Sequence, residues 1–180
     1  MATFSRIASL PIGYGTGTAW FAASGPRVEE LKSAVTASLD AGFRHLDEAE
    51  MYGNEAATGE ALSAWRAAHS EVHREALHIT SKIISVDSGV EAICRRSLAA
   101  MQLDYFDLYL VHAPFQRNGD PFSTPLPKVW AEMEALVAAG LTRAIGVSNW
   151  RVRDLQAIAG SANIHPAVNQ VEAHPSTVCP

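Results

Sequence analysis

Five polar residues mark the ends of successive apolar runs in this chain. Asp47, Lys82 and His112 each close a short β-type run, Asn149 directly follows another, and Gln170 lies near the end of a further one. In a barrel of parallel strands, the carboxyl ends of the strands converge on one mouth, where catalysis is located in this architecture. The spacing therefore predicts one shared active site.

Tyr52 lies five residues after Asp47, in the following loop, where it would lean over the same mouth. A free tyrosine hydroxyl has a pKa of about 10, so it exchanges its proton poorly near neutral pH, and a neighbouring ammonium favours the phenolate. Lys82 would supply the ammonium, Asp47 would hold it, and His112 would hydrogen-bond a carbonyl oxygen that Tyr52 protonates. None of these groups delivers a hydride, so the chemistry requires a nicotinamide cofactor.

Each residue taken singly also has a structural explanation. Asp47 would cap a turn, Lys82 would extend into solvent, and His112 would be a hydrogen-bonded core histidine. Tyr52 would be a half-buried aromatic, and Asn149 the N-cap of the next helix. Their coincidence at the same end of successive strands favours a site.

β-type runs and helical segments alternate along the chain. Strands are predicted over 12–18, 44–47, 78–83, 106–112, 143–148 and 167–171, and helices over 29–41, 55–68, 89–101, 126–139 and 151–159. The first helix shows the clearest period, with one face made of Val28, Leu31, Val35 and Leu39. Gly42 and Gly140 follow helix ends, where a left-handed cap favours glycine. This alternation implies parallel strands, in either a doubly wound sheet or a (β/α)8 barrel.

The glycines at positions 13, 15 and 17 resemble part of a dinucleotide-binding loop. That fingerprint needs its third glycine at position 18, which is Thr18, and a helix directly afterwards, whereas residues 20–26 have the character of a loop. The cluster therefore does not favour a Rossmann fold.

The composition is that of an ordinary globular domain. The 180 residues are 48% hydrophobic with a net charge of −5, so we expect one domain over residues 1–180 and neither nucleic acid nor a membrane as a partner. The N-terminus lacks a signal-peptide pattern, and no run of about eighteen apolar residues suits a membrane span. Cys94 and Cys179 form no Cys-x-x-Cys pair, and His69, His73 and His78 are predicted to lie at the surface or in loops. We expect no metal and a cytoplasmic, reducing location.

Five segments, in order and at suitable spacing, resemble the aldo-keto reductase family. They are residues 13–20 (GYGTGTAW), 42–55 (GFRHLD followed by YGNE), 103–112 (LDYFDLYLVH), 146–149 (GVSN) and 169–175 (NQVEAHP). The resemblance implies an α/β fold of the (β/α)8 TIM-barrel type, here incomplete, with about six of the eight units present.

The resemblance also implies an activity, the reversible NADPH-dependent reduction of aldehydes or ketones to alcohols. Tyr52 would be the general acid, Lys82 and Asp47 would tune it, and His112 would orient the small carbonyl substrate.

The remaining implied roles concern the cofactor, NADPH/NADP+, and the substrate pocket. Ser148, Asn149 and Gln170, together with Asp47, would hold the nicotinamide. Trp20 would line the substrate pocket beside His112; plain core packing would also explain Trp20.

The chain departs from the family at Glu48, where threonine is common. We expect this additional carboxylate near the site to alter specificity.

The second departure is the end of the chain, since residues 176–180 no longer resemble the family and about two strands of a barrel are missing. The missing part would hold an aromatic that stacks on the nicotinamide and the clamp for the 2′-phosphate, so we expect weaker cofactor binding and little preference for NADPH. Exposed barrel edges at the first and sixth strands would make the chain unstable or oligomeric. The alternative function is an inactive, truncated remnant that serves as an interaction or regulatory module.

Overall fold

Helices form where apolar residues recur at helical spacing. The computed structural model describes residues 12–86 and 88–173. Its helices are α2 (Pro26–Asp40), α3 (Glu55–Ala68), α4 (Val90–Met101), α5 (Leu126–Ala138) and α6 (Val152–Ala159), with 3-10 turns η1 (Glu50–Tyr52) and η2 (Arg74–Ala76). The predicted face of α2 is confirmed, since its fully buried residues include Leu31, Val35 and Leu39. Gly42 and Gly140 have φ of 95° and 72°, which confirms the predicted left-handed positions.

The strands form one parallel sheet in the order of the sequence. They are β1 (Tyr14–Gly15), β2 (His45–Asp47), β3 (His78–Ile83), β4 (Leu108–Val111), β5 (Ile145–Ser148) and β6 (Asn169–Gln170). Each strand pairs in parallel with the next one. A doubly wound sheet would reverse its strand order at a switch point, so the sequential order confirms the incomplete (β/α)8 barrel.

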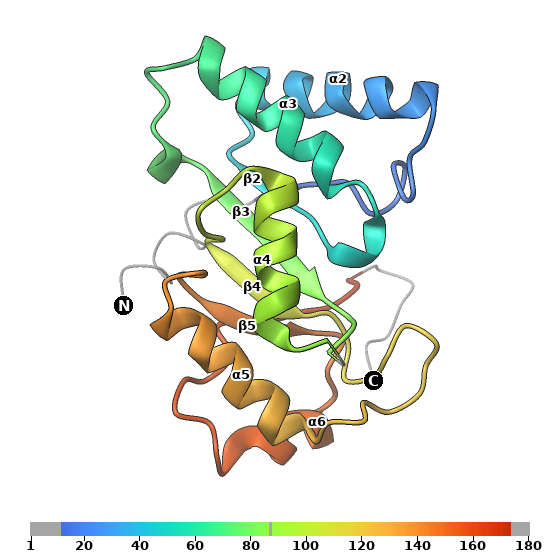
Figure 1. Cartoon of the computed structure of the whole chain (residues 1–180), viewed down its shortest axis with the longest axis vertical. Helices are drawn as coiled ribbons and strands as arrows, with labels where there is room; N and C mark the ends of the chain where they lie inside the picture. Colours follow the sequence, from blue (N-terminus) through green and yellow to red (C-terminus); the bar gives the residue numbers. More distant parts are fainter. Residues whose placement is uncertain (1–11, 87, 174–180) are drawn as a thin grey trace.

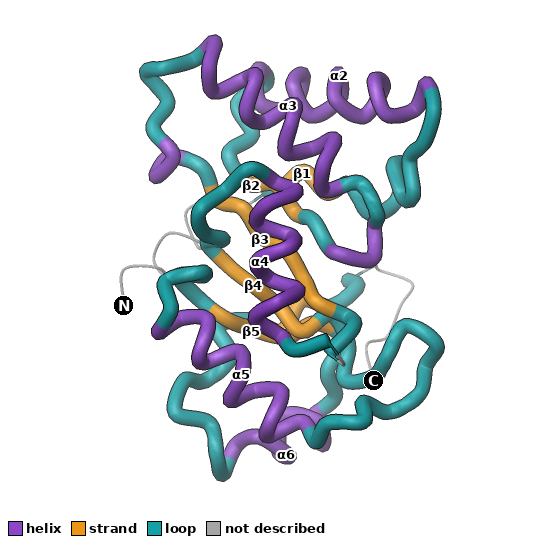
Figure 2. Tube along the Cα trace, in the orientation of Figure 1, coloured by secondary structure: helices purple, strands orange, loops and turns teal. Residues whose placement is uncertain are grey.

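The helices cover the outer side of the strands (Figures 1 and 2). In this view α4 lies across the middle of the sheet, with α2 and α3 toward one end and α5 and α6 toward the other. Each helix packs against the next one along the chain. The apolar core between helices and strands includes Ile79, Ile83, Tyr109, Trp130 and Met133.

Alternate strand residues face the inside of the incomplete barrel. They line a cavity of about 230 Å³. The lining residues are His45 and Asp47 of β2, Thr80 of β3, Leu108 and Leu110 of β4, Gln170 of β6, and Val168 just before β6. The residues between them, such as Leu46, Ile79 and Tyr109, are buried on the helix side. The two-residue period of a strand thus decides which side chains reach the mouth.

The two edge strands are shorter than predicted. β1 and β6 span two residues each, against predictions of 12–18 and 167–171, whereas β3 has the predicted bounds. Among the described residues, each edge strand has a hydrogen-bonding neighbour on one side only. The first and sixth strands are therefore edges, as expected.

The prediction for His78 is wrong. Its side chain is buried because it begins the inner strand β3, and its ring packs edge to face against His45 at a centroid distance of 4.6 Å. His73 is exposed, as predicted, and His69 is half-buried at the end of α3.

Three residues named in the sequence analysis lie beyond the described ranges, and two expected absences can be examined only within them. His174, Pro175 and Cys179 lie outside the described residues. Among the residues that are described, no helix has the length and apolarity to cross a membrane. Within the same ranges, no three His, Cys, Asp or Glu side chains are grouped so that they could hold a metal ion.

Candidate active site

Asp47 and Lys82 meet inside the mouth of the incomplete barrel. Both lie near the carboxyl ends of neighbouring strands, and the Lys82 side chain is only 2% exposed. Its ammonium donates a hydrogen bond of 2.8 Å to each carboxylate oxygen of Asp47 and one of 2.9 Å to the backbone carbonyl of Glu48. The alternative in which Lys82 extends into solvent is therefore wrong. Pairing with Asp47 offsets the cost of burying the ammonium.

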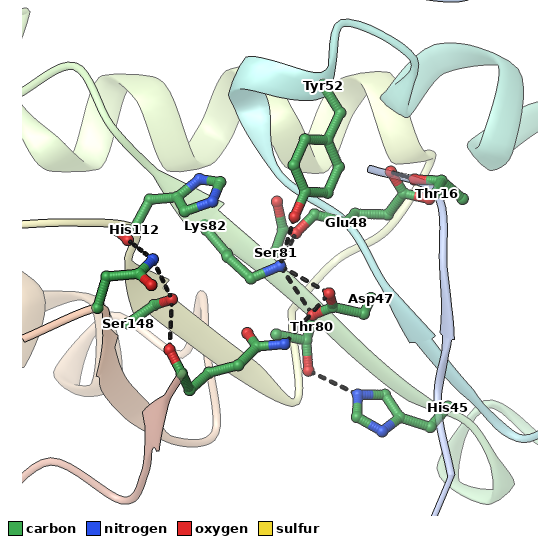
Figure 3. A network of polar contacts seen from close by, with 12 residues as sticks. Thr16, His45, Asp47, Glu48, Tyr52, Thr80, Ser81, Lys82, His112 and Ser148 are labelled. Atoms are coloured by element: carbon green, nitrogen blue, oxygen red, sulfur yellow. Dashed lines mark hydrogen bonds and ion pairs between the residues drawn. The ribbon is translucent and has the colours of Figure 1, made fainter. Parts of the chain in front are cut away.

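Tyr52 contacts the same ammonium (Figure 3). It ends η1, the 3-10 turn that follows β2, and its hydroxyl oxygen lies 3.2 Å from Lys82 Nζ. Its backbone carbonyl accepts a 2.7 Å hydrogen bond from the Ala22 amide. The phenol therefore contacts a positively charged group, and a positive charge favours a phenolate over a neutral phenol.

Gly17 makes the position of the phenol ring possible. A Cβ atom at residue 17 would collide with the ring of Tyr52, at 2.8 Å from both Cε atoms. From the sequence, this glycine was interpreted only as part of a dinucleotide fingerprint, and its packing role was missed. The available signal was the cluster itself, because a glycine without a phosphate to bind often marks a close approach.

His112 directly follows β4 and lies against Tyr52, with the two rings edge to face at a centroid distance of 5.6 Å. Burial lowers the pKa of His112 to about 4; the Lys82 ammonium also lowers it, and the Asp47 carboxylate opposes this. The imidazole is therefore neutral near pH 7 and has one N–H to donate. Its Nδ1 atom is buried without a hydrogen-bond partner in the described part of the chain.

Ser148, Asn149 and Gln170 form a hydrogen-bonded row at the ends of β5 and β6. The Ser148 hydroxyl donates to the backbone carbonyl of Gln170 at 2.7 Å, and the Asn149 side-chain amide donates to the Ser148 hydroxyl at 3.0 Å. The Asn149 amide also donates to the backbone carbonyl of His112 at 3.0 Å. At the other end of the row, the Gln170 amide donates to Asp47 at 3.3 Å. The structure thus brings the two predicted groups of residues together.

Asn149 has a backbone conformation that its role as a helix cap would not require. Its φ is 57°, in the left-handed region that asparagine tolerates better than most residues. The N-cap of α6 is Arg151, so the alternative of Asn149 as the cap is wrong. Strained backbone of this kind clusters at functional sites.

The hydrogen bonds of Trp20 go to residues outside this network. Its indole N–H donates to the Tyr14 hydroxyl at 3.0 Å, and its backbone carbonyl accepts a bond of 3.0 Å from Asn54. The next residue, Phe21, contacts the Tyr52 ring edge to face at a centroid distance of 6.4 Å and is 37% exposed. Sequence reasoning missed Phe21, because nothing in its local pattern separates it from a surface aromatic.

Glu48 does not face the mouth. Its side chain is fully buried and accepts a 2.7 Å hydrogen bond from the Thr16 hydroxyl. Asp47 faces the interior, so the next residue along the chain turns to the opposite side, toward α3. The carboxyl group therefore does not line the mouth, and the expectation that Glu48 alters specificity stays a prediction.

The sequence as a whole matches one protein family. The profile of the Aldo/keto reductase family matches residues 11–178, which is nearly the whole chain. The chain belongs to this family.

Individual relatives agree with that assignment. Aldo-keto reductase family 1 member A1 of Rattus norvegicus is 40% identical over 91% of this chain and 53% of its own length, and the Homo sapiens protein of that name is 41% identical over the same shares. The solved aldose reductase from Schistosoma japonicum superposes with a TM-score of 0.79 at 36% identity, over 90% of this chain and 56% of that chain. The chain therefore spans about half the length of the curated relatives it matches.

Proposed function

We propose that this chain carries the proton-transfer machinery of an NADPH-dependent carbonyl reductase, which converts aldehydes or ketones to alcohols reversibly. Membership in the aldo/keto reductase family supports carbonyl reduction in general. The observation that carries the residue roles is the buried ammonium of Lys82, which contacts both Asp47 and the Tyr52 hydroxyl. Tyr52 is the general acid in this proposal.

The hydrogen bonds of Lys82 explain how the phenol would give up its proton. As the proton leaves Tyr52 for the carbonyl oxygen, negative charge develops on the phenol oxygen, 3.2 Å from the ammonium. Asp47 keeps the ammonium charged and oriented through two bonds of 2.8 Å. A fixed charge in a buried site stabilises developing charge more strongly than it would in water.

His112 would orient the substrate carbonyl. A neutral imidazole, with its pKa lowered to about 4, can donate one N–H to a carbonyl oxygen and does not compete with Tyr52 as an acid near pH 7. Its ring lies against that of Tyr52, so both groups can reach one oxygen atom. Trp20, and with it Phe21, would form the wall of the pocket on the β1 side.

The groups at the ends of β5 and β6 suit the carboxamide of a nicotinamide. Asn149 and Gln170 are exposed side-chain amides joined through Ser148, and Gln170 also touches Asp47. Amides and hydroxyls both donate and accept hydrogen bonds, as a carboxamide requires. Bound there, NADPH would supply the hydride that no side chain can provide.

A spectrophotometric assay of NADPH oxidation with a generic aromatic aldehyde tests the proposal. We expect turnover that falls by about 100-fold or more in Tyr52→Phe, because the general acid is lost. The matched control is Tyr105→Phe, since Tyr105 lies before β4, at the opposite end of the strands, and stacks between Arg74 and Arg143. Equal turnover in wild type and Tyr52→Phe would contradict the assignment.

We also propose that the two sheet edges pair with further polypeptide, so that the isolated 180-residue chain is oligomeric or unstable. We place the protein in the cytoplasm. Its parallel edge strands β1 and β6 are short and exposed or half-buried, and unpaired edges promote association. Sedimentation combined with thermal melting tests this. A soluble monomer with one sharp, cooperative transition would contradict it. The alternative function, an inactive interaction module, has no support from the relatives.

A further inference from the structure

Glu48 is a buried carboxyl group that the proposed chemistry does not use. It is 0% exposed, and Lys82 binds its backbone carbonyl, not its carboxyl group. One carboxyl oxygen accepts the bond from Thr16; the other, Oε1, has no hydrogen bond within the described residues. A buried carboxylate without a cation would be costly, so this position favours the uncharged acid.

The groups that face Glu48 reinforce this preference. Burial raises the pKa of Glu48 to about 8; the Thr16 and Thr58 hydroxyls lower it, and the carboxylates of Glu55 on α3 and Asp47 on β2 raise it further. The one cationic group described in this network, Lys82, is taken up by Asp47 and by the backbone carbonyl of Glu48.

Two short paths connect Glu48 to the proton-transfer residues (Figure 3). On one side Thr16 donates its hydroxyl to the carboxyl group at 2.7 Å, and the next residue, Gly17, packs directly against the Tyr52 ring. On the other side the backbone carbonyl of Glu48 accepts the 2.9 Å bond from Lys82. Glu48 therefore contacts the segment that packs against the phenol through its side chain, and the ammonium through its backbone.

We propose that Glu48 is a positioning residue, whose uncharged acid anchors Thr16 and thereby holds Gly17 beneath the ring of Tyr52. Ionisation would place an anion without a cationic partner in the core, and the protein would relieve its cost by admitting water, which would displace the Thr16 segment. The part of this inference that concerns turnover rests on the proposed function, whereas the anchoring of residues 16 and 17 does not.

Urea unfolding of wild type and Glu48→Gln between pH 5 and 9 tests the buried acid. The folded-state pKa lies above the ordinary value of 4.5, so the folded protein binds more protons between about pH 4.5 and 8 and loses stability as the pH rises through this window. We expect the unfolding constant of wild type, relative to Glu48→Gln, to rise by up to about tenfold per pH unit there. Glu55 is present in both proteins, so its contribution to the pH dependence of stability cancels in the comparison. The control Glu71→Gln, at an exposed position, should keep the wild-type slope, and a wild-type slope in Glu48→Gln would overturn the proposal.

Two further readouts separate positioning from plain packing. The backbone amide resonances of Thr16 and Gly17 should titrate in the same pH window in wild type and stay constant in Glu48→Gln. The decline of kcat at high pH should begin at higher pH in Glu48→Gln, with KM unchanged. If stability differs but neither the resonances nor the kcat profile do, Glu48 is only a packing residue and the proposal is overturned. If no variant turns over, the proposed function fails, while the resonances still decide the anchoring.

Discussion

The proposed proton-transfer side and the proposed nicotinamide side of the site differ in how firmly this chain holds them. Lys82 is 2% exposed on β3, which has strand neighbours on both sides, and it makes hydrogen bonds to Asp47, Tyr52 and the Glu48 backbone. Gln170, in contrast, is exposed on the edge strand β6, and its contact to Asp47 is 3.3 Å long. The position of each residue in the sheet, more than its residue type, therefore sets how many contacts hold it. Variants of Lys82 on the inner strand β3 should therefore have large effects, and variants of Gln170 on the edge strand β6 small ones.

The largest effect is expected for Lys82→Met, which removes the buried ammonium. Asp47 would lose its partner and the phenol its charge stabilisation, so we expect kcat to fall on the order of 1000-fold. Stability should also fall, by about 3 kcal/mol, because a partly buried carboxylate is left unpaired. Turnover assays combined with urea unfolding separate the two losses. The control is Lys128→Met on the exposed side of α5, and similar kinetics for both variants would refute the role of Lys82.

Asp107→Asn should affect stability without affecting chemistry. Asp107 is 2% exposed before β4, at the amino ends of the strands, and pairs with Arg74 at 2.8 Å and Arg143 at 3.6 Å. Weakening this cluster should cost about 3 kcal/mol of unfolding free energy. The amino ends of barrel strands contribute to stability and not to catalysis, so kcat and KM should stay within about twofold of wild type. A selective loss of kcat in folded protein would show that the two ends are coupled.

The residues at the inner strand ends were predictable because their positions follow from strand periodicity. Asp47, Lys82 and His112 end apolar runs, and parallel pairing brings such ends together whatever the details of packing. The roles of Gly17 and Glu48 were not predictable in this way. They depend on contacts between segments about 30 residues apart in sequence, Gly17 with Tyr52 and Thr16 with Glu48, which no local pattern encodes. The edge strands were predicted too long, because local β character does not reveal a missing neighbour.

Gly17→Ala should displace the phenol ring without removing any of the proposed proton-transfer groups. The added methyl group would collide with Tyr52, and misplacement by about 1 Å can cost up to about 100-fold in rate. We therefore expect kcat to fall between roughly 10- and 100-fold, with the fold retained by circular dichroism. Gly160→Ala is the matched control, since an added Cβ there meets nothing within 4 Å and φ is −82°. Wild-type kcat in Gly17→Ala would show that the ring position is not critical.

The smallest effect is expected for Gln170→Ala at the sheet edge. The variant loses one exposed hydrogen bond to Asp47 and one proposed contact to the carboxamide. Each such bond contributes about 1 kcal/mol, so the KM for NADPH should rise by roughly fivefold with little change in kcat. Gln156→Ala, at an exposed position of α6, serves as the control. A loss of kcat as large as that of Lys82→Met would remove the distinction between the two halves.

The central claim, that Tyr52 protonates a carbonyl while a bound nicotinamide reduces it, is tested most directly by isotope transfer. NADPH deuterated at C4 of the nicotinamide is incubated with an aromatic aldehyde and the protein, either as the 180-residue chain or extended by two further βα units. We predict deuterium on the carbinol carbon of the alcohol. Tyr52→Phe should form this alcohol more slowly than wild type, by about 100-fold or more. An alcohol without deuterium, or equal rates with and without the Tyr52 hydroxyl, would contradict the account.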